Sequence, residues 1–297
     1  MRTKHGMDQA EGLRSLLMVN QTRLITVIAG KQGIGRTSVT INLAAALARS
    51  GKDVLVLDEN QAPNNLLDRL MLSPHRDLLD VAQGRCAVKQ AVMRAQGFSI
   101  LPAARVMCTL NQLHAVEQQR LEQALTEASN GVDVMLVDAV LLQGRLAVSS
   151  GLATGVAMLV VVDATASGIT ETYAMIKRLA LENARLQFAI AVNKADSELE
   201  AMTVFENMAR VARNHLSARL EYLGYIPFDA KLQRATQLGR TVVEAFPSSS
   251  SARAYLELAQ KLSRLPVGQD EPVVDIPTML QSLIRQMGNG EMARVLN

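Results

Sequence analysis

Glycine, lysine, arginine and threonine gather near the start of this 297-residue chain, between two apolar segments. They form the run Gly30-Lys31-Gln32-Gly33-Ile34-Gly35-Arg36-Thr37-Ser38. Glycines let successive backbone N–H groups point at one anion, and the first turn of a following helix adds the positive end of its dipole. The spacing of Gly30, Gly35 and Thr37 fits the phosphate-binding pattern G-x-x-x-x-G-K-[ST], with Arg36 in place of the lysine. The chemistry indicated is the binding of nucleotide phosphates.

The same pattern predicts which groups hold the nucleotide. Backbone N–H groups from position 33 to position 37 are expected on the α- and β-phosphates, and the Thr37 hydroxyl on Mg²⁺. Asp138 ends an apolar run and is placed like the acidic residue that holds Mg²⁺ through water in such sites. Asp58 ends another apolar run and is expected to join it. The expected nucleotide-binding residues of the loop are Gly30, Gly33, Ile34, Gly35, Arg36, Thr37 and Ser38.

Strand and helix patterns alternate around these residues, from 24 to 264. Strands are predicted at 24–29, 53–57, 98–101, 132–137, 156–162, 188–192 and 222–226. Helices are predicted at 37–49, 66–72, 78–83, 86–95, 111–128, 169–182, 199–219, 230–238 and 249–264. Continuous apolar strands separated by helices indicate a parallel sheet that is buried on both faces. The predicted fold class is α/β, a P-loop NTPase-like, mostly parallel twisted sheet with helices on both faces.

Ligands of such sheets bind beyond the carboxyl ends of the strands. Gly30, Asp58, Asp138 and Asn193 all end or follow a predicted strand. We therefore expect these residues to meet at one edge of the sheet, where the nucleotide would bind.

Two segments with other patterns flank the predicted domain, which spans 21–265. Residues 1–20 predict a short helix that begins near Asp8, either an end that packs on its own domain or a peptide that binds a partner. Residues 266–297 predict a linker and an amphipathic helix, which docks either on the domain or on a membrane surface. Its apolar stripe consists of Ile276, Met279, Leu280, Leu283, Ile284 and Met287.

The composition argues against several classes of protein. No run of about eighteen apolar residues is present to span a membrane, and the charged N-terminus does not fit a secretory signal. Cys86 and Cys108 lack metal-ligand spacing and suggest no disulfide framework, so a reducing cytoplasm is expected. The net charge of +3 and the few aromatic residues argue against nucleic acid as a ligand.

The phosphate loop resembles the deviant loop K-G-G-x-G-K-[ST] of the MinD/ParA ATPases. The residues after it, over 42–48, 51–52 and 54–58, resemble the first helix and second strand of that family. Further along, 223–229 resembles the family segment G-x-[IV]-P-x-D, and 247–252 resembles P-x-S-x-x-A. The resemblance extends over residues 22–264 and implies an ATPase of this family.

Within the family, the N-terminal segment resembles the motif D-Q-A-x-x-L-R of the flagellar-number regulators called FlhG or FleN. The matching residues are Asp8, Gln9, Ala10, Leu13 and Arg14. The segment 101–104 also suits that branch. The resemblance implies a role in the number or placement of flagella. It also implies that the N-terminal motif binds FlhF, a GTPase of the signal-recognition type, and stimulates its hydrolysis.

The resemblance further implies how nucleotide acts. ATP or ADP with Mg²⁺ binds the loop, Asn193 contacts adenine, and ATP pairs two copies face to face, with Lys31 reaching the partner's phosphates. Lys31, Asp58 and Asn60 stand at the positions tied to catalysis. The tail helix binds the inner face of the cell membrane when the dimer forms, through Met279, Leu280, Leu283 and Ile284. The expected location is therefore the cytoplasm and that membrane surface.

Four features depart from the family pattern. Arg36 replaces a compact lysine with a larger planar group, and Gln32 replaces a glycine, which strains the loop if this position needs positive φ. Asn60 replaces the aspartate tied to the attacking water, and an amide cannot take a proton from that water. After Asp138, leucines at 141–142 favour packing over sensing of the γ-phosphate. Together these changes predict weak or slow hydrolysis.

Two other functions stay open on the sequence. One is a non-catalytic scaffold of the same fold that still docks on the GTPase. The other is a ParA-like ATPase that segregates DNA through a basic patch at Arg210, Arg213 and Arg219, which we expect on one helix. Such arginines are more often a solvated face, and the small net charge argues against nucleic acid as a partner.

Overall fold

The computed structural model describes residues 22–63, 65–139, 141–142, 145–146, 157–183, 187–216 and 218–264. The predicted partner-binding helix at 1–20 and the predicted linker and tail helix at 266–297 lie outside the described residues. Both stay predictions.

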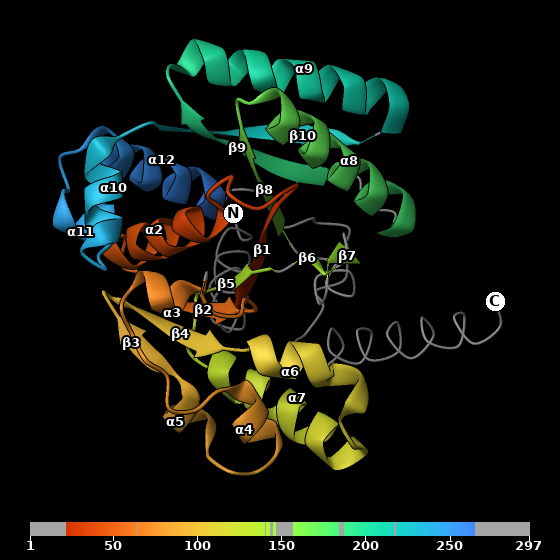
Figure 1. The fold of residues 1–297 in the computed structure, drawn as a ribbon, viewed down its shortest axis with the longest axis vertical. Coiled ribbons are helices and arrows are strands. Elements are labelled where there is room, and N and C mark those ends of the chain that lie inside the picture. Colours follow the sequence, from red (N-terminus) through yellow and green to blue (C-terminus); the bar gives the residue numbers. More distant parts are fainter. Residues whose placement is uncertain are drawn as a thin grey trace, which may run out of the picture.

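An eight-stranded sheet forms the centre of the described part (Figure 1). Its order is β10-β9-β8-β1-β5-β2-β4-β3, and the pairs are parallel except β3 with β4. The strands are β1 Arg23–Ala29, β2 Val54–Asp58, β3 Met93–Ala95, β4 Phe98–Pro102, β5 Val134–Asp138, β8 Ala157–Asp163, β9 Gln187–Ala195 and β10 Arg219–Pro227. A separate short hairpin joins β6 Leu141–Leu142 to β7 Arg145–Leu146. The predicted fold class is confirmed.

Side chains of the central strands alternate between two hydrophobic cores, one on each face of the sheet. On β2, Leu55 and Leu57 belong to one core, whereas Val54 and Val56 belong to the other. Because both faces are covered, the strands are apolar throughout, which is the pattern that a parallel sheet requires.

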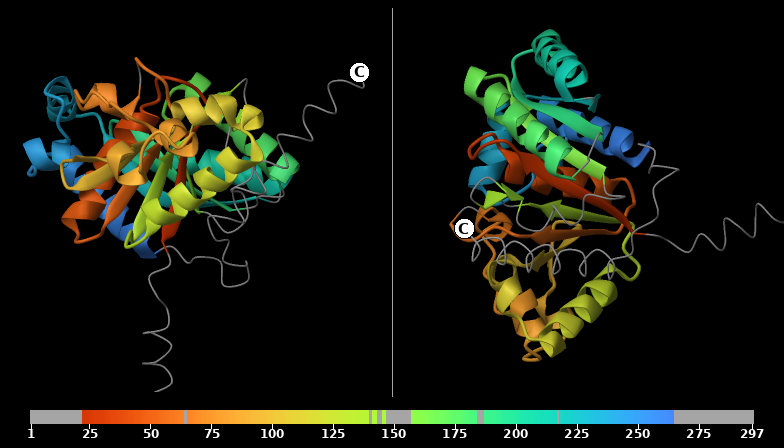
Figure 2. Two further views of the ribbon diagram at one scale, coloured as in Figure 1. Left: turned by 90° about the horizontal axis from the view of Figure 1, so that it is seen from below. Right: turned by 90° about the vertical axis from the view of Figure 1, so that its right-hand side faces the viewer.

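Two groups of helices provide this cover (Figures 1 and 2). The first core contains residues of α4 Leu78–Ala82, α5 Val88–Ala91, α6 Ala104–Thr109, α7 Ala115–Ser129, α8 Ala166–Asn183 and α9 Glu198–Leu216. The second contains residues of α2 Arg36–Arg49, α3 Leu66–Arg69, α10 Ala230–Gln237, α11 Val242–Ala245 and α12 Ser250–Arg264. A single-turn 3₁₀ helix, η1 Leu110–Gln112, leads from α6 to α7.

Helix α2 is buried along most of its length because it packs between the sheet and α12. Its alanines at positions 44–46 are buried, and such small side chains permit a close approach of neighbouring backbones. Asn42 fixes the helix further, because its amide donates to Ser38 O at 2.8 Å and its carbonyl accepts from Val242 N at 2.7 Å. These contacts therefore tie α2 to the start of α11.

The carboxyl ends of the strands lie at one edge of the sheet, as predicted. In the register of β2 with β5, Asp58 is the direct neighbour of Asp138. On the other side of β1, Asp163 of β8 is the neighbour of Asn193 in β9. The sheet thus gathers polar side chains from four strands beside the start of α2.

The predicted helix at 86–95 is wrong in its second half. Residues 93–95 form β3, which pairs antiparallel with β4 so that Ala95 lies opposite Phe98. The two residues between them, Gln96 and Gly97, both have positive φ, of 51° and 91°. That is the geometry of a two-residue hairpin turn, and it reverses the chain.

Two further helix predictions need correction. The predicted helix at 199–219 ends at Leu216, and Arg219 begins β10, where it pairs with Gln187. The predicted helix at 111–128 begins only at Ala115, after two short helical segments, α6 and η1. At 219 the pairing with a strand that is distant in sequence replaces the helix, and local periodicity does not reveal such a pairing.

Candidate functional site

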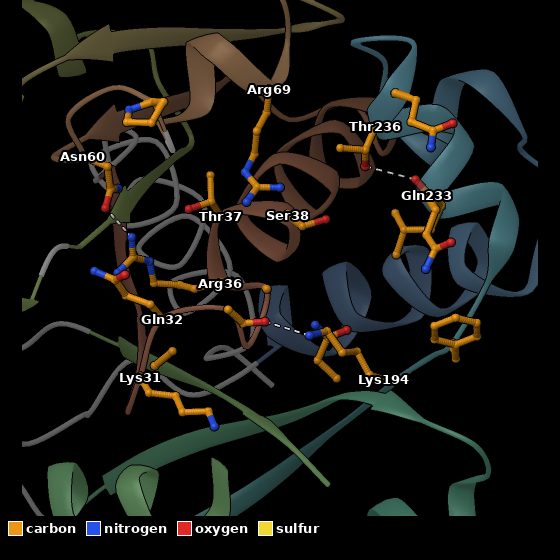
Figure 3. A pocket seen from close by; sticks show the side chains of 18 of the residues that line it. Lys31, Gln32, Arg36, Thr37, Ser38, Asn60, Arg69, Lys194, Gln233 and Thr236 are labelled. Atoms are coloured by element: carbon orange, nitrogen blue, oxygen red, sulfur yellow. Dashed lines mark hydrogen bonds between the residues drawn. The ribbon is translucent and has the colours of Figure 1, made fainter. Parts of the chain in front are cut away.

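A cavity of about 1020 Å³ opens at the carboxyl edge of the sheet. The phosphate loop and the first turn of α2 form its floor, and residues at or just after the ends of β2, β9 and β10 and on α10 form its walls (Figure 3). A volume of this order suits a small-molecule ligand the size of a nucleotide.

The phosphate loop runs from β1 into α2, as the sequence predicts. Gly35 caps the helix in the left-handed conformation with φ of 103°, and no side chain accepts a hydrogen bond from the first turn. Helix starts leave backbone N–H groups without intrahelical partners, and such groups bind anions. The conditional prediction of strain at Gln32 is not borne out, because the positive φ of the loop lies at Gly33 and Gly35 instead.

Two loop glycines are required by close approaches. A Cβ on Gly30 would lie 2.3 Å from the backbone N of Thr172 in α8, and a Cβ on Gly35 would lie 2.4 Å from Nδ2 of Asn193. At Gly30 the obstacle is backbone, so only glycine fits there. At Gly35 a Cβ would displace the Asn193 side chain and would also be strained by the positive φ of 103°.

Two adjacent residues at the end of β9 hold the loop from the side. Asn193 Nδ2 donates to Ile34 O at 2.7 Å, and Lys194 Nζ donates to Gly33 O at 2.7 Å (Figure 3). The structure therefore places Asn193, the predicted adenine contact, against the loop backbone. Lys194 was not predicted, although its left-handed backbone with φ of 58° marks it as unusual for a lysine.

The Arg36 side chain turns toward the ends of β2 and β5. Its Nε donates to Asp138 Oδ1 at 2.8 Å, and its Nη2 donates to Asn60 Oδ1 (Figure 3). Asp138 is fully buried and the Arg36 side chain is 17% exposed, so this ion pair is largely shielded from water. Arg36, which replaces the phosphate-binding lysine, thus forms a hydrogen-bonded ion pair with Asp138, the acidic residue predicted to hold Mg²⁺.

Three other side chains complete the surroundings of Asp138. Thr37 Oγ1 and Asn60 Nδ2 donate to Oδ2 at 2.8 Å each. Thr40 Oγ1 lies 3.1 Å from both Oδ1 and Arg36 O, and these two acceptors share its one proton. With Arg36, four donors meet a carboxylate that has about four acceptor positions. Of these donors, Thr40 was not predicted.

Asp58 lies beside Asp138 and is also committed to hydrogen bonds. Its Oδ1 accepts from the backbone N and Nδ2 of Asn60 at 3.1 Å each, and its Oδ2 accepts from Leu66 N at 2.8 Å. Burial, and then the negative charge of Asp138, raise the pKa of Asp58 to about 7. Asn60 therefore acts here as a donor that joins two buried carboxyl groups.

The expected Mg²⁺ does not fit these side chains as they are arranged. Mg²⁺ requires oxygen ligands with free lone pairs in near-octahedral geometry. Thr37, Asp58 and Asp138 were the predicted ligands, and both carboxylates already accept hydrogen bonds on each oxygen.

Lys31 lies at the outer end of the loop. Its Nζ donates to the hydroxyl of Ser167 near the start of α8, within the same chain. The predicted contact with a second copy is not tested by this arrangement.

The three arginines of the predicted basic patch do not lie on one helix, contrary to expectation. Arg210 and Arg213 lie on α9, whereas Arg219 lies on β10. The three arginines nevertheless line one open hollow, together with the acidic Glu206.

Neither cysteine belongs to a disulfide, since Cys86 and Cys108 are both free. Across the described ranges, we find no helix that combines the length and the apolar character needed to cross a membrane.

The family described as CobQ/CobB/MinD/ParA nucleotide binding domain (CbiA) matches residues 25–242. Antiactivator FleN of Pseudomonas aeruginosa is 34% identical over 256 residues, which cover 86% of this chain and 91% of FleN. The flagellum site-determining protein YlxH of Helicobacter pylori is 24% identical over 90% of this chain and 91% of its own.

The fold has solved counterparts. The septum site-determining protein MinD of Pyrococcus horikoshii, solved with Mg-ADP, is similar with a TM-score of 0.64 at 24% identity, covering 82% of this chain and 97% of that one. At this identity the likeness concerns the fold alone. The match of the family over most of the chain decides the classification: this protein is a member of the CobQ/CobB/MinD/ParA family of nucleotide-binding domains.

Proposed function

We propose that this protein is a nucleotide-binding regulator of flagellar number or placement, with weak or slow ATP hydrolysis. The observation that carries the proposal is the phosphate loop, whose open helix start faces a cavity and is held by Asn193 and Lys194. The flagellar role is supported by the similarity to FleN and to YlxH.

Slow hydrolysis is supported by the partners of Arg36 and Asn60. Both side chains are bonded to Asp138, and Asn60 also donates to Asp58. Phosphoryl transfer needs a group that stabilises charge on the phosphate and a group that positions the attacking water. In this arrangement neither Arg36 nor Asn60 is free for these roles.

The proposal divides the chain into three parts. The domain at 21–265 binds ATP or ADP and forms a nucleotide-dependent homodimer through Lys31. Residues 1–20 bind an FlhF-like GTPase, and the helix within 266–297 provides a peripheral contact with the inner face of the cell membrane. Its place of action is the cytoplasm.

A second candidate function is a scaffold without catalysis. It is favoured by the same network around Asp138, because a site whose polar groups satisfy one another is stable without a ligand. In this version the N-terminal segment docks on the GTPase whether or not nucleotide is present.

The test is a measurement of nucleotide in and on the purified full chain. We expect ATP or ADP to be released from the denatured protein and identified by mass spectrometry, and a fluorescent ATP analogue to bind with saturation. Gly35→Ala in the loop should weaken this binding. Gly51→Ala is the matched control, because Gly51 lies far from the loop, also has positive φ, and has open space where its Cβ would be. No bound nucleotide at millimolar supply would overturn the switch and leave the scaffold.

The docking part has its own test. Arg14→Ala in the full chain is expected to abolish stimulation of the partner GTPase and to leave nucleotide binding unchanged. Equal stimulation by both chains would overturn the role of the N-terminal motif.

A further inference from the structure

The carboxylate of Asp138 is buried at the end of β5, and the positive charge beside it comes from the chain itself, through Arg36, which lines the cavity. Arg36 supplies that charge from the first residue of α2, at 2.8 Å. Isolated charges are rarely buried, because their desolvation is costly unless they are paired and hydrogen-bonded. The pair therefore satisfies a requirement that a bound cation would otherwise meet.

The shape of the guanidinium explains why arginine can do this. Its nitrogens are spread over a planar fork, so one group faces Asp138 while another reaches the amide oxygen of Asn60. Asn60 then donates to Asp58 Oδ1 at 3.1 Å and to Asp138 Oδ2 at 2.8 Å. One cationic side chain and one amide thus join the acidic ends of β2 and β5. A lysine ammonium is a compact point charge and lacks this fork.

A divalent cation and the Arg36 guanidinium would compete for the same oxygen atoms. A carboxylate holds Mg²⁺ either directly, at about 2.0–2.1 Å, or through a metal-bound water that donates to it, and both arrangements need its lone pairs. On Asp138 those lone pairs face Arg36 and Thr40 on one oxygen and Thr37 and Asn60 on the other. Binding of the metal would require Arg36 to leave, which would uncover a buried charge.

We propose that Arg36 is a built-in cation that takes the place of Mg²⁺ beside Asp138. The folded chain therefore does not take up a divalent cation there, and it binds nucleotide equally well with or without one. The statement about nucleotide rests on the proposed function, whereas the statement about the cation does not. The inference deepens that function, since it names the ligand as the metal-free nucleotide.

The first experiment measures thermal unfolding of the full chain without nucleotide. MgCl₂ at 10 mM is compared with NaCl at equal ionic strength, for the wild type, Arg36→Ala and the control Arg49→Ala. Arg49 lies at the other end of α2 and donates to Val243 O, so its loss removes the same charge far from Asp138. Ligands that bind only the folded state raise its melting temperature.

We expect Mg²⁺ to raise the melting temperature of Arg36→Ala by about 3–5 °C, because the freed carboxylate accepts the cation. The wild type and Arg49→Ala should show no difference between the two salts. The inference would be overturned if MgCl₂ raised the melting temperature of the wild type above its value in NaCl, or if it did not raise that of Arg36→Ala.

The wild type alone keeps the inference testable if Arg36→Ala does not fold. Mn²⁺ titrated into the nucleotide-free wild type and followed by electron paramagnetic resonance should stay free in solution. One equivalent of bound Mn²⁺ would contradict the built-in cation.

The second experiment titrates the wild type with a fluorescent ATP analogue in EDTA and in MgCl₂. The dissociation constants should agree within about twofold, and a tenfold tightening by Mg²⁺ would overturn the inference while leaving the proposed function intact. Absence of binding in both media would instead overturn the proposed function, and the melting experiment would still decide the role of Arg36.

Discussion

Asp229 and Ser251 are joined by two hydrogen bonds, from the hydroxyl of Ser251 at 2.7 Å and from its backbone N at 3.1 Å. The same carboxylate oxygen accepts from Ser250 Oγ at 3.1 Å, and the other oxygen accepts from Lys231 N at 2.8 Å. One side chain therefore holds the starts of both α10 and α12. Since α10 forms a wall of the cavity, this contact helps to keep the site in shape.

We expect Asp229→Asn to lower the free energy of unfolding by about 1–3 kcal/mol at neutral pH, through loss of charge-assisted hydrogen bonds. Burial alone would raise the pKa of Asp229, but the hydrogen bonds from Ser251, Lys231 and Ser250 outweigh it and hold this pKa below its usual value. A lowered pKa in the folded state gives stability that is present above the unfolded pKa and is lost as pH falls. The difference between wild type and variant should shrink from pH 7 to pH 3 in denaturant titrations. The exposed Asp68 provides the control substitution Asp68→Asn.

The opposite pH dependence is expected for Asp58. Its pKa is raised from 3.8 to about 7, so the folded state holds a proton that the unfolded state releases. Stability is then fully present below the unfolded pKa and is lost as pH rises through the folded one. Denaturant titrations should show Asp58→Asn gaining stability relative to the wild type between about pH 4 and pH 7. A pH-independent difference would contradict the raised pKa.

The phosphate loop offers a matched pair of glycine substitutions. Gly33→Ala meets open space and only the cost of positive φ, about 1–2 kcal/mol, whereas Gly35→Ala also brings a Cβ to 2.4 Å from Asn193 Nδ2. We expect Gly35→Ala to lose more stability than Gly33→Ala and to weaken binding of a fluorescent ATP analogue about tenfold or more. Equal effects of the two substitutions would show that the contact with Asn193 does not matter.

Hydrolysis is expected to respond to two substitutions made together. Asn60→Asp alone should destabilise the protein, because the two hydrogens of Nδ2, which face Asp58 Oδ1 and two oxygens of Asp138, are lost and a third carboxylate joins Asp58 and Asp138. Arg36→Lys with Asn60→Asp supplies a compact cation and a carboxylate that accepts a proton, so single-turnover ATP hydrolysis should rise about tenfold or more. If the wild type already hydrolyses ATP as fast as the double variant, the slow-hydrolysis proposal is wrong.

Local patterns were sufficient to predict the parallel sheet and the position of the site. Apolar β-branched runs mark the buried strands, and the rule that ligands bind at carboxyl ends brings Asp58, Asp138 and Asn193 to one edge. The glycine spacing likewise predicted the loop between β1 and α2.

The contacts inside the site depend on geometry that the sequence does not contain. The pattern suggests that Arg36 faces phosphate, but its guanidinium instead faces Asp138, 102 residues further along the chain. Thr40 was missed because it lies one helical turn after the expected residue Thr37, and Lys194 because it directly follows the expected residue Asn193. Only the folded backbone shows that both side chains point into the site. The hairpin at Gln96 and Gly97 was missed because β3, Met93–Ala95, is too short to show a period that distinguishes a strand from the end of a helix.

The contact between Gly30 and Thr172 has a mechanical consequence. Backbone touches backbone there, with no side chain between them that might yield by changing rotamer. A displacement of the loop toward α8 must push the whole helix, and a displacement away from it must open a gap. The position of α8, which is eighteen residues long, is therefore tied directly to the position of the loop backbone at Gly30.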